Sequence, residues 1–464
     1  MARGKKAVKE LTPEEKLERA LVPEEEWPYE IPGNWCWTTV ENVSTVVTGK
    51  TPSKEHPEYY GDEFPFFKPS DLDVGRHVSE ASEYLSEQGK NMVRIIPPQS
   101  TAVCCIGSIG KCGYLEIEGT TNQQINSAIP HFNPLYVFYF MNTDYFVNQL
   151  WAKSSATTIS IVNKAKMESC YFPLAPLAEQ QRIVERIESI FAKLDEAKEK
   201  VQTVAGGFEL RKSAILHKAF TGGLTKQWRQ EHGVGMDSWK SVSLAKVCKV
   251  NPPKIDTKEL PDDMEVSFFP MSALSEISGE IIDPQIRPLK EVRSGFTNFI
   301  EGDVVFAKIT PCMENGKSAV IGKLVNDIGY GTTEFFVLRC GEGLYNRYLY
   351  HLVRDRRFRS RAKAVMAGAV GQQRVPKSFL EEYLLRLPSI AEQEEIVRIL
   401  DEMFAREVKI KDMSETVIGE INVVKKSVLA RAFRGMLDTN DPTEKNAMKL
   451  LAEMEGGGFD CYQG

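Results

Sequence analysis

Apolar residues recur at alternating steps of three and four in two stretches of the chain, one after Pro176 and one after Ser389. This spacing is typical of a coiled-coil seam. The predicted seam positions are Ile183, Ile187, Leu194 and Val201 in the first stretch and Ile396, Leu400, Met403, Ile410 and Val417 in the second. A helix of about 44 residues would be about 65 Å long. Because neither helix could bury its stripe alone, we expect an antiparallel pair; the alternative is that each helix packs only on its own domain.

Local signals mark the ends and interruptions of these helices. Leu-Ala-Glu-Gln at 177–180 fits a helix start with an acid near the positive end of the helix dipole. Gly206-Gly207 could bend the first helix, and Gly222-Gly223 is a natural stop. The second seam is interrupted by Glu407 and Ser414, where the first has Leu194 and Val201. Such polar seam positions can fix the register of a helix pair.

The two helical stretches are copies of one another. When the sequence is shifted by 213 positions, 18 of the 51 residues from 174 to 224 are identical to those from 387 to 437. Chance would give about three, so this is a duplication. The similarity extends upstream more loosely, with an offset that drifts between 202 and 212. Each half therefore has a divergent front and a similar back, which indicates different but related tasks for the fronts and a common task for the backs.

The fronts have the pattern of mixed α/β domains. Strand-like runs at 100–106, 303–309 and 335–338 alternate with loops rich in Lys, Thr, Ser, Asn and Gln. Lys and Arg neutralise phosphates, while Asn, Gln and Arg can read base edges. From 352 to 380, eight basic residues accompany one acid, a local charge of +7. The alternative is that these are ordinary polar turns and a solvated helix face. The candidate DNA-binding residues are Lys50, Thr51, Ser53, Lys54, Lys68, Lys111, Asn122, Gln123, Gln124, Lys164, Lys254, Lys308, Thr310, Asn315, Lys317, Thr333, Arg354, Arg357, Arg361, Arg374 and Lys377.

Composition places the chain among folded proteins of several domains. Its 464 residues carry a formal net charge of −6, which argues weakly against nucleic acid, but a local basic patch can hide in that total. No apolar run reaches the roughly 18 residues of a membrane helix, and no secretory signal is visible at the start. Nine cysteines without a Cys-x-x-Cys motif favour free thiols in a reducing cytoplasm.

Motifs for catalysis are weak throughout. Asn-Pro-Pro-Lys at 251–254 is similar to the Asn-Pro-Pro-aromatic motif of amino-methyltransferases, but its fourth residue is Lys and no glycine-rich turn for a methyl donor accompanies it. Ser-Ile-Gly-Lys-Cys at 108–112 lacks the spacing of a phosphate-binding loop. The six histidines are scattered, so we expect no metal site. These observations predict a chain without catalytic residues, not an enzyme.

Over about residues 30 to 437, the chain resembles the specificity subunit of a type I restriction-modification enzyme. The matching elements are Gly-Lys-Thr-Pro-Ser at 49–53, Ser-Ile-Gly-Lys at 108–111, Thr-Asn-Gln-Gln-Ile-Asn at 121–126, Ile-Thr-Pro-Cys-Met-Glu-Asn-Gly-Lys at 309–317, Gly-Thr-Thr-Glu-Phe at 331–335 and Pro-Leu-Ala-Pro-Leu-Ala-Glu-Gln at 173–180. The last is the most specific. The second copy departs from it, with Arg-Leu-Pro-Ser-Ile-Ala-Glu-Gln at 386–393.

The resemblance implies an α+β protein in which two mixed α/β target-recognition domains are separated by two long antiparallel helices that form a coiled-coil spacer with a pseudo-twofold repeat. Each recognition domain would read one half of a bipartite site in double-stranded DNA. The helices would set the gap and dock two methyltransferase subunits, so that an adenine is methylated, and restriction subunits would join for cleavage. S-adenosylmethionine, ATP and Mg would be bound by these partners, with no cofactor in this chain.

The expected organisation, with no membrane segment, is an N-terminal helical extension at 1–30, a first recognition domain at 31–175, a first spacer helix at 176–224, a linker at 225–236, a second recognition domain at 237–385, a second spacer helix at 386–437 and a mobile C-terminal tail at 438–464. Thr-Pro-Glu-Glu at 12–15 predicts a capping box at the start of a helix that docks on a partner or on the spacer. A different class of function remains open, a coiled-coil scaffold that binds proteins through its fronts without reading DNA.

Overall fold

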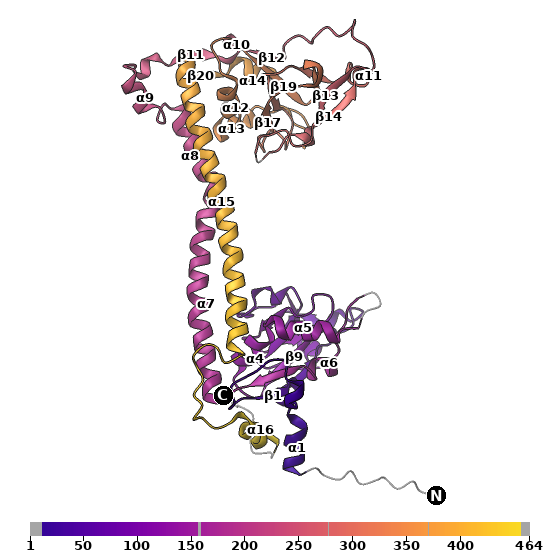
Figure 1. The fold of residues 1–464 in the computed structure, drawn as a ribbon. Helices are drawn as coiled ribbons and strands as arrows, with labels where there is room; N and C mark the ends of the chain where they lie inside the picture. Colours follow the sequence, from indigo (N-terminus) through magenta and orange to yellow (C-terminus); the bar gives the residue numbers. More distant parts are fainter. Residues whose placement is uncertain (1–11, 156–158, 277, 370, 456–464) are drawn as a thin grey trace. The chain divides into compact units, whose positions relative to one another are not determined.

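The computed structural model describes residues 12–155, 159–276, 278–369 and 371–455 (Figure 1). It divides into two compact units, which we call unit 1 (residues 1–201 and 416–464) and unit 2 (residues 202–415). Each unit contains one front and segments of the long helices. No helix in the described ranges is long and apolar enough to cross a membrane.

Unit 1 is built around two small sheets. The first has the strand order β2 (Ser44–Thr48), β9 (Ile125–Pro130), β6 (Thr101–Cys104) and β7 (Cys112–Tyr114), with antiparallel neighbours throughout. The second has the order β3 (Tyr60–Gly61), β5 (Glu83–Leu85), β4 (Phe64–Phe67) and β8 (Thr120–Thr121), and β1 (Cys36–Thr39) pairs separately with β10 (Tyr171–Leu174). The helices of this front are α1 (Pro13–Ala20), α2 (Val40–Val43), α3 (Glu87–Lys90), α4 (Pro134–Met141), α5 (Asp144–Lys153) and α6 (Lys164–Glu168).

Unit 2 repeats this plan. Its first sheet has the order β12 (Cys248–Val250), β19 (Phe335–Cys340), β16 (Val304–Ala307) and β17 (Ser318–Val320). Its second has the order β14 (Gln285–Pro288), β13 (Glu265–Phe269), β18 (Gly329–Gly331) and β15 (Thr297–Phe299), and β11 (Lys240–Ser243) pairs with β20 (Leu384–Leu387). The helices are α10 (Leu244–Val247), α11 (Leu289–Val292), α12 (Asn346–Arg354), α13 (Arg356–Ala364) and α14 (Lys377–Glu382). The two fronts thus share one strand order although their sequences diverge.

The predicted long helices are present, with a break where the paired glycines predict it. The first runs as α7 (Leu177–Gly206) and resumes as α8 (Phe208–Phe220), while the second is continuous as α15 (Ile390–Ala432). Within unit 1, Lys425 pairs with Asp195 at 2.6 Å. Within unit 2, Arg211 pairs with Glu407 at 2.8 Å. In each unit the residue numbers on one helix rise as those on the other fall, so the packed segments are antiparallel (Figure 1).

Burial along the seam is uneven. Ile183, Ile187, Ile396 and Leu400 are buried, and they lie in the cores of their own fronts as well as against the other helix. Leu194, Val201 and Met403 are half-buried. Ile410 and Val417 are each 37% exposed, whereas the polar seam positions Glu407 and Ser414 are buried. Glu407 is held by Arg211, and the Ser414 hydroxyl donates to the Ile410 carbonyl at 2.8 Å. The long helices therefore pack on their own fronts and also against each other, so both alternatives for helix packing apply.

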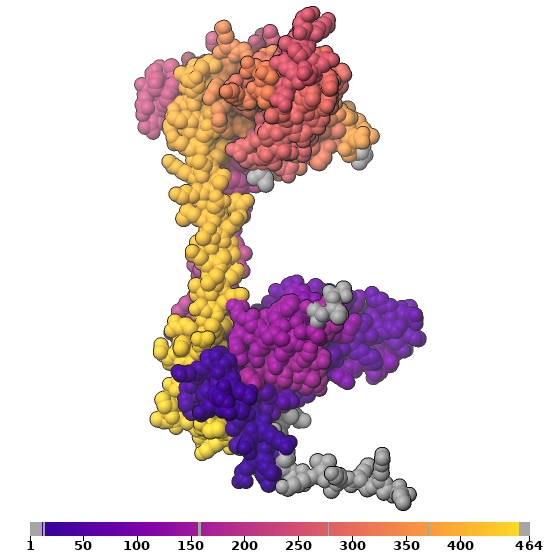
Figure 2. Space-filling view, turned by 45° about the vertical axis from the view of Figure 1, so that its right-hand side comes forward, coloured from indigo at the N-terminus to yellow at the C-terminus, as the bar shows by residue number. Residues whose placement is uncertain are grey.

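The first and last described helices of the chain pack together in unit 1. The predicted capping box is present at Thr12, and α1 packs against α16 (Ala447–Glu455) rather than on a spacer helix (Figure 2). Ala20, Ala447 and Leu451 are buried in the same core. Residues 438–455 therefore differ from the mobile tail expected from sequence, because a short apolar stripe on α16 packs into this core. Residues 1–11 and 456–464 lie outside the described residues.

The expected linker is also structured. It contains α9 (Lys226–Glu231), and its Arg229 is buried. Short 3-10 turns occur at Glu24–Glu26, Pro57–Tyr59, Asp71–Val74, Met236–Ser238, Met271–Ala273 and Val325–Asp327. The eight cysteines in the described ranges are all free thiols, in agreement with the sequence analysis.

Candidate nucleic-acid interface

The strand order of unit 1 brings three predicted loops to one edge of the first sheet. In an antiparallel sheet, the end of one strand lies beside the start of its neighbour. The loop after β2 (49–54), the β6–β7 loop (105–111) and the segment before β9 (121–124) therefore converge. Backbone hydrogen bonds join them, since Lys50 N donates to the Thr121 carbonyl at 2.9 Å and Cys105 N to the Gln124 carbonyl at 2.7 Å. We call these three segments the loop edge of unit 1.

Gly49 allows segment 49–54 to approach segment 121–124 closely. A Cβ at this position would lie 2.2 Å from the Asn122 carbonyl oxygen and 2.4 Å from that of Thr121. Thr51 Oγ1 also donates to the Gln123 side chain, and the Asn122 side chain accepts from Gln124 N at 3.0 Å. The polar side chains are thus fixed on a compact scaffold, with Lys50, Ser53, Lys54 and Gln123 exposed.

Unit 2 forms the same edge with different residues. The segments are 251–254 after β12, 308–317 between β16 and β17, and 332–334 before β19. Lys308 N donates to the Glu334 carbonyl at 2.9 Å, and Asn251 N donates to the Val337 carbonyl at 2.7 Å. Lys254 and Thr333 are exposed. Together with 366–374, described below, these segments are the loop edge of unit 2.

A further segment belongs to each edge and is absent from the predicted loops. Ile161 forms bridges with Ile106 and Ser155, and Arg374 forms the corresponding bridges with Ile309 and Ala367. In unit 2, Gln372 and Gln373 directly precede Arg374. Thr310 N donates to the Gln373 carbonyl at 3.0 Å, and Gln373 N donates to Thr310 Oγ1 at 3.2 Å. Their amides are suited to reading adenine. The Gln-Gln pair was the sequence signal for this segment, and a count of charged residues does not detect it.

Several predicted lysines are engaged within the protein. Lys111 Nζ donates to the Pro69 carbonyl at 3.1 Å and pairs with Asp73 at 2.5 Å. In unit 2, Lys317 Nζ donates to the Met271 carbonyl at 3.2 Å. These two residues form the repeated Gly-Lys pairs, and in both units the lysine ties the loop edge to a neighbouring turn. Lys68 pairs with Glu83 at 2.7 Å, and Lys164 with Glu168 at 3.4 Å across one helical turn.

Several residues of the basic stretch at 354–377 are engaged within the protein. Arg354 is 7% exposed, and it donates to the carbonyls of Gly316 and Glu276 at 3.1 and 3.0 Å. Arg374 makes a bidentate pair with Glu334, which holds the pKa of that carboxyl below its ordinary value. The predicted local charge of +7 counted only neighbours in sequence, and it overstates the basic surface.

Three other basic residues of this stretch have acidic partners. Arg357 lies 3.4 Å from Asp355, Lys363 pairs with Glu314, and Lys377 lies 2.8 Å from Glu381. Arg361 is exposed beside Tyr383. Asn315 donates to Glu276 at 3.0 Å, and the Lys308 ammonium lies over the Phe336 ring. Of the predicted set, Arg354 and Asn122 are buried, 7% and 8% exposed, which argues against direct contact of their side chains with DNA.

At the start of each long helix lies a buried glutamate whose carboxylate accepts hydrogen bonds from the front. Glu179 accepts from Trp35 Nε1 at 2.7 Å, and Glu392 accepts from Trp239 Nε1 at 2.9 Å. Burial raises the pKa of Glu179, whereas Glu392 forms a buried ion pair with Arg229 at 2.5 Å. In sequence this Ala-Glu-Gln motif resembled a dipole-compensating acid, but both carboxylates are below 2% exposed. The motif fixes each long helix to its front.

Two tandem fronts of one fold, each with a polar loop edge and each fixed to a long helix, define a duplicated binding protein. The chain belongs to the family described as "Type I restriction modification DNA specificity domain", whose model matches residues 32–204 and again 236–418. This result agrees with the family resemblance identified from the sequence motifs.

Individual relatives match over different lengths. The chain is 38% identical over 162 residues to the type I restriction enzyme EcoAI specificity subunit of Escherichia coli, covering 35% of this chain and 27% of that protein. It is 21% identical over 426 residues to the StySPI specificity subunit of Salmonella potsdam, covering 88% and 90%. The chain spans 43% of the length of the EcoEI specificity subunit, which it also matches.

Solved structures share the fold. A chain from a study of complex assembly and conformational transition of the type I R-M system has a TM-score of 0.64 at 19% identity, covering 88% of this chain and all of that one. The HsdS subunit from Thermoanaerobacter tengcongensis has a TM-score of 0.56 at 19% identity, with 89% and 99% covered. At this identity the likeness concerns architecture.

Proposed function

We propose that this chain is the DNA sequence-specificity subunit of a type I restriction-modification complex. Each loop edge reads one half of a bipartite site in double-stranded DNA. The observation that carries the proposal is the duplicated loop edge. The same strand order occurs in both units, and in each it brings together segments rich in Lys, Thr, Asn and Gln, with different side chains in the two copies. Different readers on one fold suit a site whose two halves differ.

The long helices complete the proposal. They set the gap between the two half-sites, and their similar sequences present similar surfaces to two methyltransferase subunits. Those subunits flip and methylate an adenine. Restriction subunits then add cleavage, and S-adenosylmethionine, ATP and Mg are bound by these partners. This chain contributes positioning and no catalytic group.

The direct test is DNA binding by the full chain with its methyltransferase partner, measured by fluorescence anisotropy over a range of salt. If several cations contact phosphates, affinity falls steeply as salt rises. Replacing Lys50 and Lys54 with Ala should reduce the slope of log affinity against log salt by about 1.8, or about 0.9 per contact. Lys200→Ala is the matched control, since Lys200 is an exposed lysine on α7 of the same unit and is paired with Glu196.

The alternative function, a protein-binding scaffold, predicts a different result. In that case the complex would bind DNA weakly, and Lys50 and Lys54 would have the same small effect as Lys200. Adenine methylation at a split sequence by the assembled complex, with none by the purified chain alone, would exclude the scaffold.

A further inference from the structure

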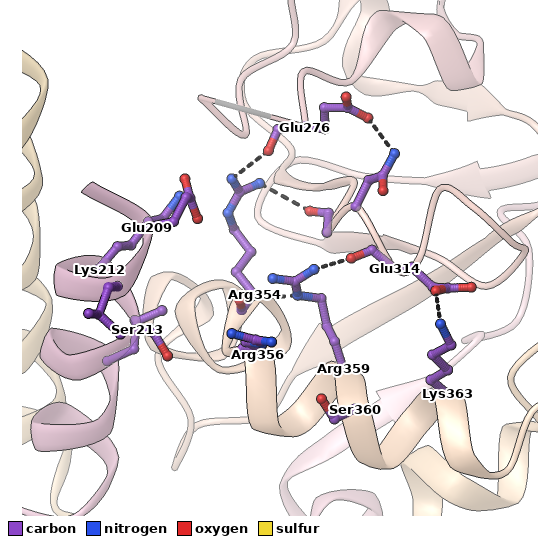
Figure 3. Close-up of a pocket in the computed structure, with 14 residues that line it drawn as sticks. Glu209, Lys212, Ser213, Glu276, Glu314, Arg354, Arg356, Arg359, Ser360 and Lys363 are labelled. Atoms are coloured by element: carbon purple, nitrogen blue, oxygen red, sulfur yellow. Dashed lines mark hydrogen bonds and ion pairs between the residues drawn. The ribbon is translucent and has the colours of Figure 1, made fainter. Parts of the chain in front are cut away.

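A basic pocket in unit 2 lies outside the loop edge. It is a cavity of about 650 Å³ between α8, the start of α13 and the turn at 314–316 (Figure 3). Five basic and three acidic side chains line it, a net charge of +2. The basic residues are Lys212, Arg354, Arg356, Arg359 and Lys363, and the acidic residues are Glu209, Glu276 and Glu314. We call this cavity the α8 pocket.

Two of the three acids are already engaged. Glu314 pairs with Lys363, and Glu276 accepts from Asn315 Nδ2 at 3.0 Å. Arg359 donates to the Glu314 carbonyl, and Arg354 donates to the carbonyls of Glu276 and Gly316, as Figure 3 shows. These bonds fix the two guanidinium groups at the wall of the pocket, but carbonyl acceptors do not neutralise their charge.

Lys212 enters the same pocket from α8 without a counter-ion. Its ammonium lies 5.9 Å from the centres of the Phe208 and Phe404 rings, and no carboxylate within the described ranges lies at ion-pair distance from it. Burial lowers the pKa of Lys212, and the facing Arg354 and Arg359 lower it further, while Glu209 acts in the opposite sense. Three cations that converge in a partly buried cavity favour an anion between them.

The repeat provides an internal comparison. A shift of 213 positions places Lys212 on Lys425 and Phe404 on Phe191. In unit 1 these residues line the corresponding cavity, of about 620 Å³, and Lys425 lies 4.8 Å from the Phe191 ring centre. There, however, Lys425 pairs with Asp195 at 2.6 Å. The residue of unit 2 that corresponds to Asp195 is Val408, which is 50% exposed.

The part of each cavity that is formed by the front also differs in charge between the two units. Asn142 of unit 1 aligns, at a shift of 212, with Arg354 of unit 2. Arg76, the arginine of the unit 1 cavity, pairs with Glu188 at 3.1 Å and with Glu116 at 3.4 Å. The cavity of unit 1 is therefore balanced by its own carboxylates, whereas the α8 pocket has gained an arginine and lost the acid that would hold its lysine.

We propose that the α8 pocket binds a phosphate group, with Lys212, Arg356 and Arg359 as donors, and that the corresponding cavity of unit 1 does not. Lys and Arg donors around a partly enclosed space bind phosphate through charge-assisted hydrogen bonds. The phosphate comes from the DNA backbone or from solution. The first source rests on the proposed function, and it would make the pocket a positioning contact that carries no sequence information.

The test uses the full chain and three variants. Lys212→Met removes the unpaired ammonium, and Val408→Asp restores the carboxylate that unit 1 has at Asp195. Lys425→Met is the matched control, since it removes the same charge from the balanced cavity. Circular dichroism and thermal melting first establish that each variant is folded. Val408→Asp changes an exposed position on α15, so it tests the charge without removing a packed side chain.

Two measurements follow. In a calorimetric titration with inorganic phosphate, Lys212→Met and Val408→Asp should weaken binding about tenfold, as expected for a lost charged hydrogen bond, whereas Lys425→Met should not. In DNA binding by the complex, each of the first two variants should reduce the salt slope by about 0.9 and leave sequence preference unchanged if the source is the backbone.

A change in the phosphate titration alone supports the pocket with free phosphate as its ligand. A change in the DNA salt slope supports it with the DNA backbone as its ligand. If the wild-type complex does not bind DNA, the proposed function fails while the phosphate titration still decides on the pocket. The proposal is overturned if Lys212→Met and Val408→Asp match the wild type in both measurements, or if Lys425→Met has the same effect as they do.

Discussion

Arg229 and Glu392 form the most buried ion pair described above, with side chains 7% and 1% exposed. Glu392 also accepts from Thr225 Oγ1 at 2.6 Å and from Trp239 Nε1 at 2.9 Å, so its lone pairs are satisfied. Removal of one partner from such a pair leaves an uncompensated buried charge. This pair therefore fixes α9 and the start of α15 to each other.

We predict that Arg229→Met lowers the free energy of unfolding by about 3–5 kcal/mol, measured by urea denaturation of the full chain. Arg398→Met is the control, since Arg398 makes exposed ion pairs with Glu395 and Glu402 and should leave the midpoint unchanged. Equal midpoints for Arg229→Met and the wild type would show that the buried charge is compensated by other groups.

His351 makes the stability of unit 2 depend on pH. Burial lowers its pKa below the ordinary 6.5, although Asp401, 3.4 Å away, opposes the shift, and Arg347 and Arg354 add to it. The unfolded chain thus binds a proton at His351 before the folded chain does. Stability is fully present above pH 6.5 and is lost as the pH falls from 6.5 through the lowered folded pKa. We predict that His351→Gln flattens the fall in urea midpoint between pH 7.5 and 5.5. Parallel wild-type and variant profiles would contradict this.

Sequence reasoning at this scale identified residue types better than it identified roles. Lys111 and Lys317 were selected because lysine binds phosphate, yet both donate to carbonyls of the same protein. Arg354 was selected from a run of basic residues, and it is buried against backbone carbonyls. In each case the partner lies about 40 or more positions away in the sequence, where no local pattern can indicate it. Gly49 was noticed as part of a motif, but its need for close approach became evident only with residues 121 and 122 in place.

At the scale of elements, the loop edge of unit 1 depends on the absence of a side chain at Gly49. A methyl group there would meet two carbonyl oxygens of the neighbouring segment, neither of which can rotate away. We predict that Gly49→Ala displaces 49–54 at a cost of about 1–3 kcal/mol and weakens DNA binding by the complex. Anisotropy with the cognate duplex measures the effect.

Gly33→Ala is the control for that substitution, because a Cβ at Gly33 has no atom within 4 Å. It should bind DNA as the wild type does. Unchanged DNA binding by Gly49→Ala would show that the loop tolerates the displacement or does not contact DNA.

The long helices were the elements that sequence predicted best, because a heptad pattern repeated over many turns leaves little ambiguity. Burial in the middle of the second helix is less regular than the apolar pattern. The seam near Glu407 and Ser414 is polar and buried, while Ile410 and Val417 are partly exposed. The periodicity placed Glu407 and Ser414 on the seam, but their partners, Arg211 and the Ile410 carbonyl, became evident only in the structure.

At the scale of the whole molecule, the duplication is the feature that organises everything else. It was visible in the similar backs, and the common strand order extends it to the divergent fronts. The sequence did not indicate the structure after the second long helix, since residues 438–455 were expected to be mobile and instead pack on unit 1 through α16. Nine residues of amphipathic helix are too few to stand out beside a glycine run, and the core that receives them includes residues as distant in sequence as Ala20 and Trp35.

The central claim is that the two fronts read two half-sites independently. The most direct measurement replaces residues 31–175 with the corresponding front of a relative that has a different target, and maps adenine methylation by the assembled complex across a genome. The account predicts that one half of the recognised sequence changes while the other half and the gap stay the same. A target that changes in both halves, or in neither, would contradict it.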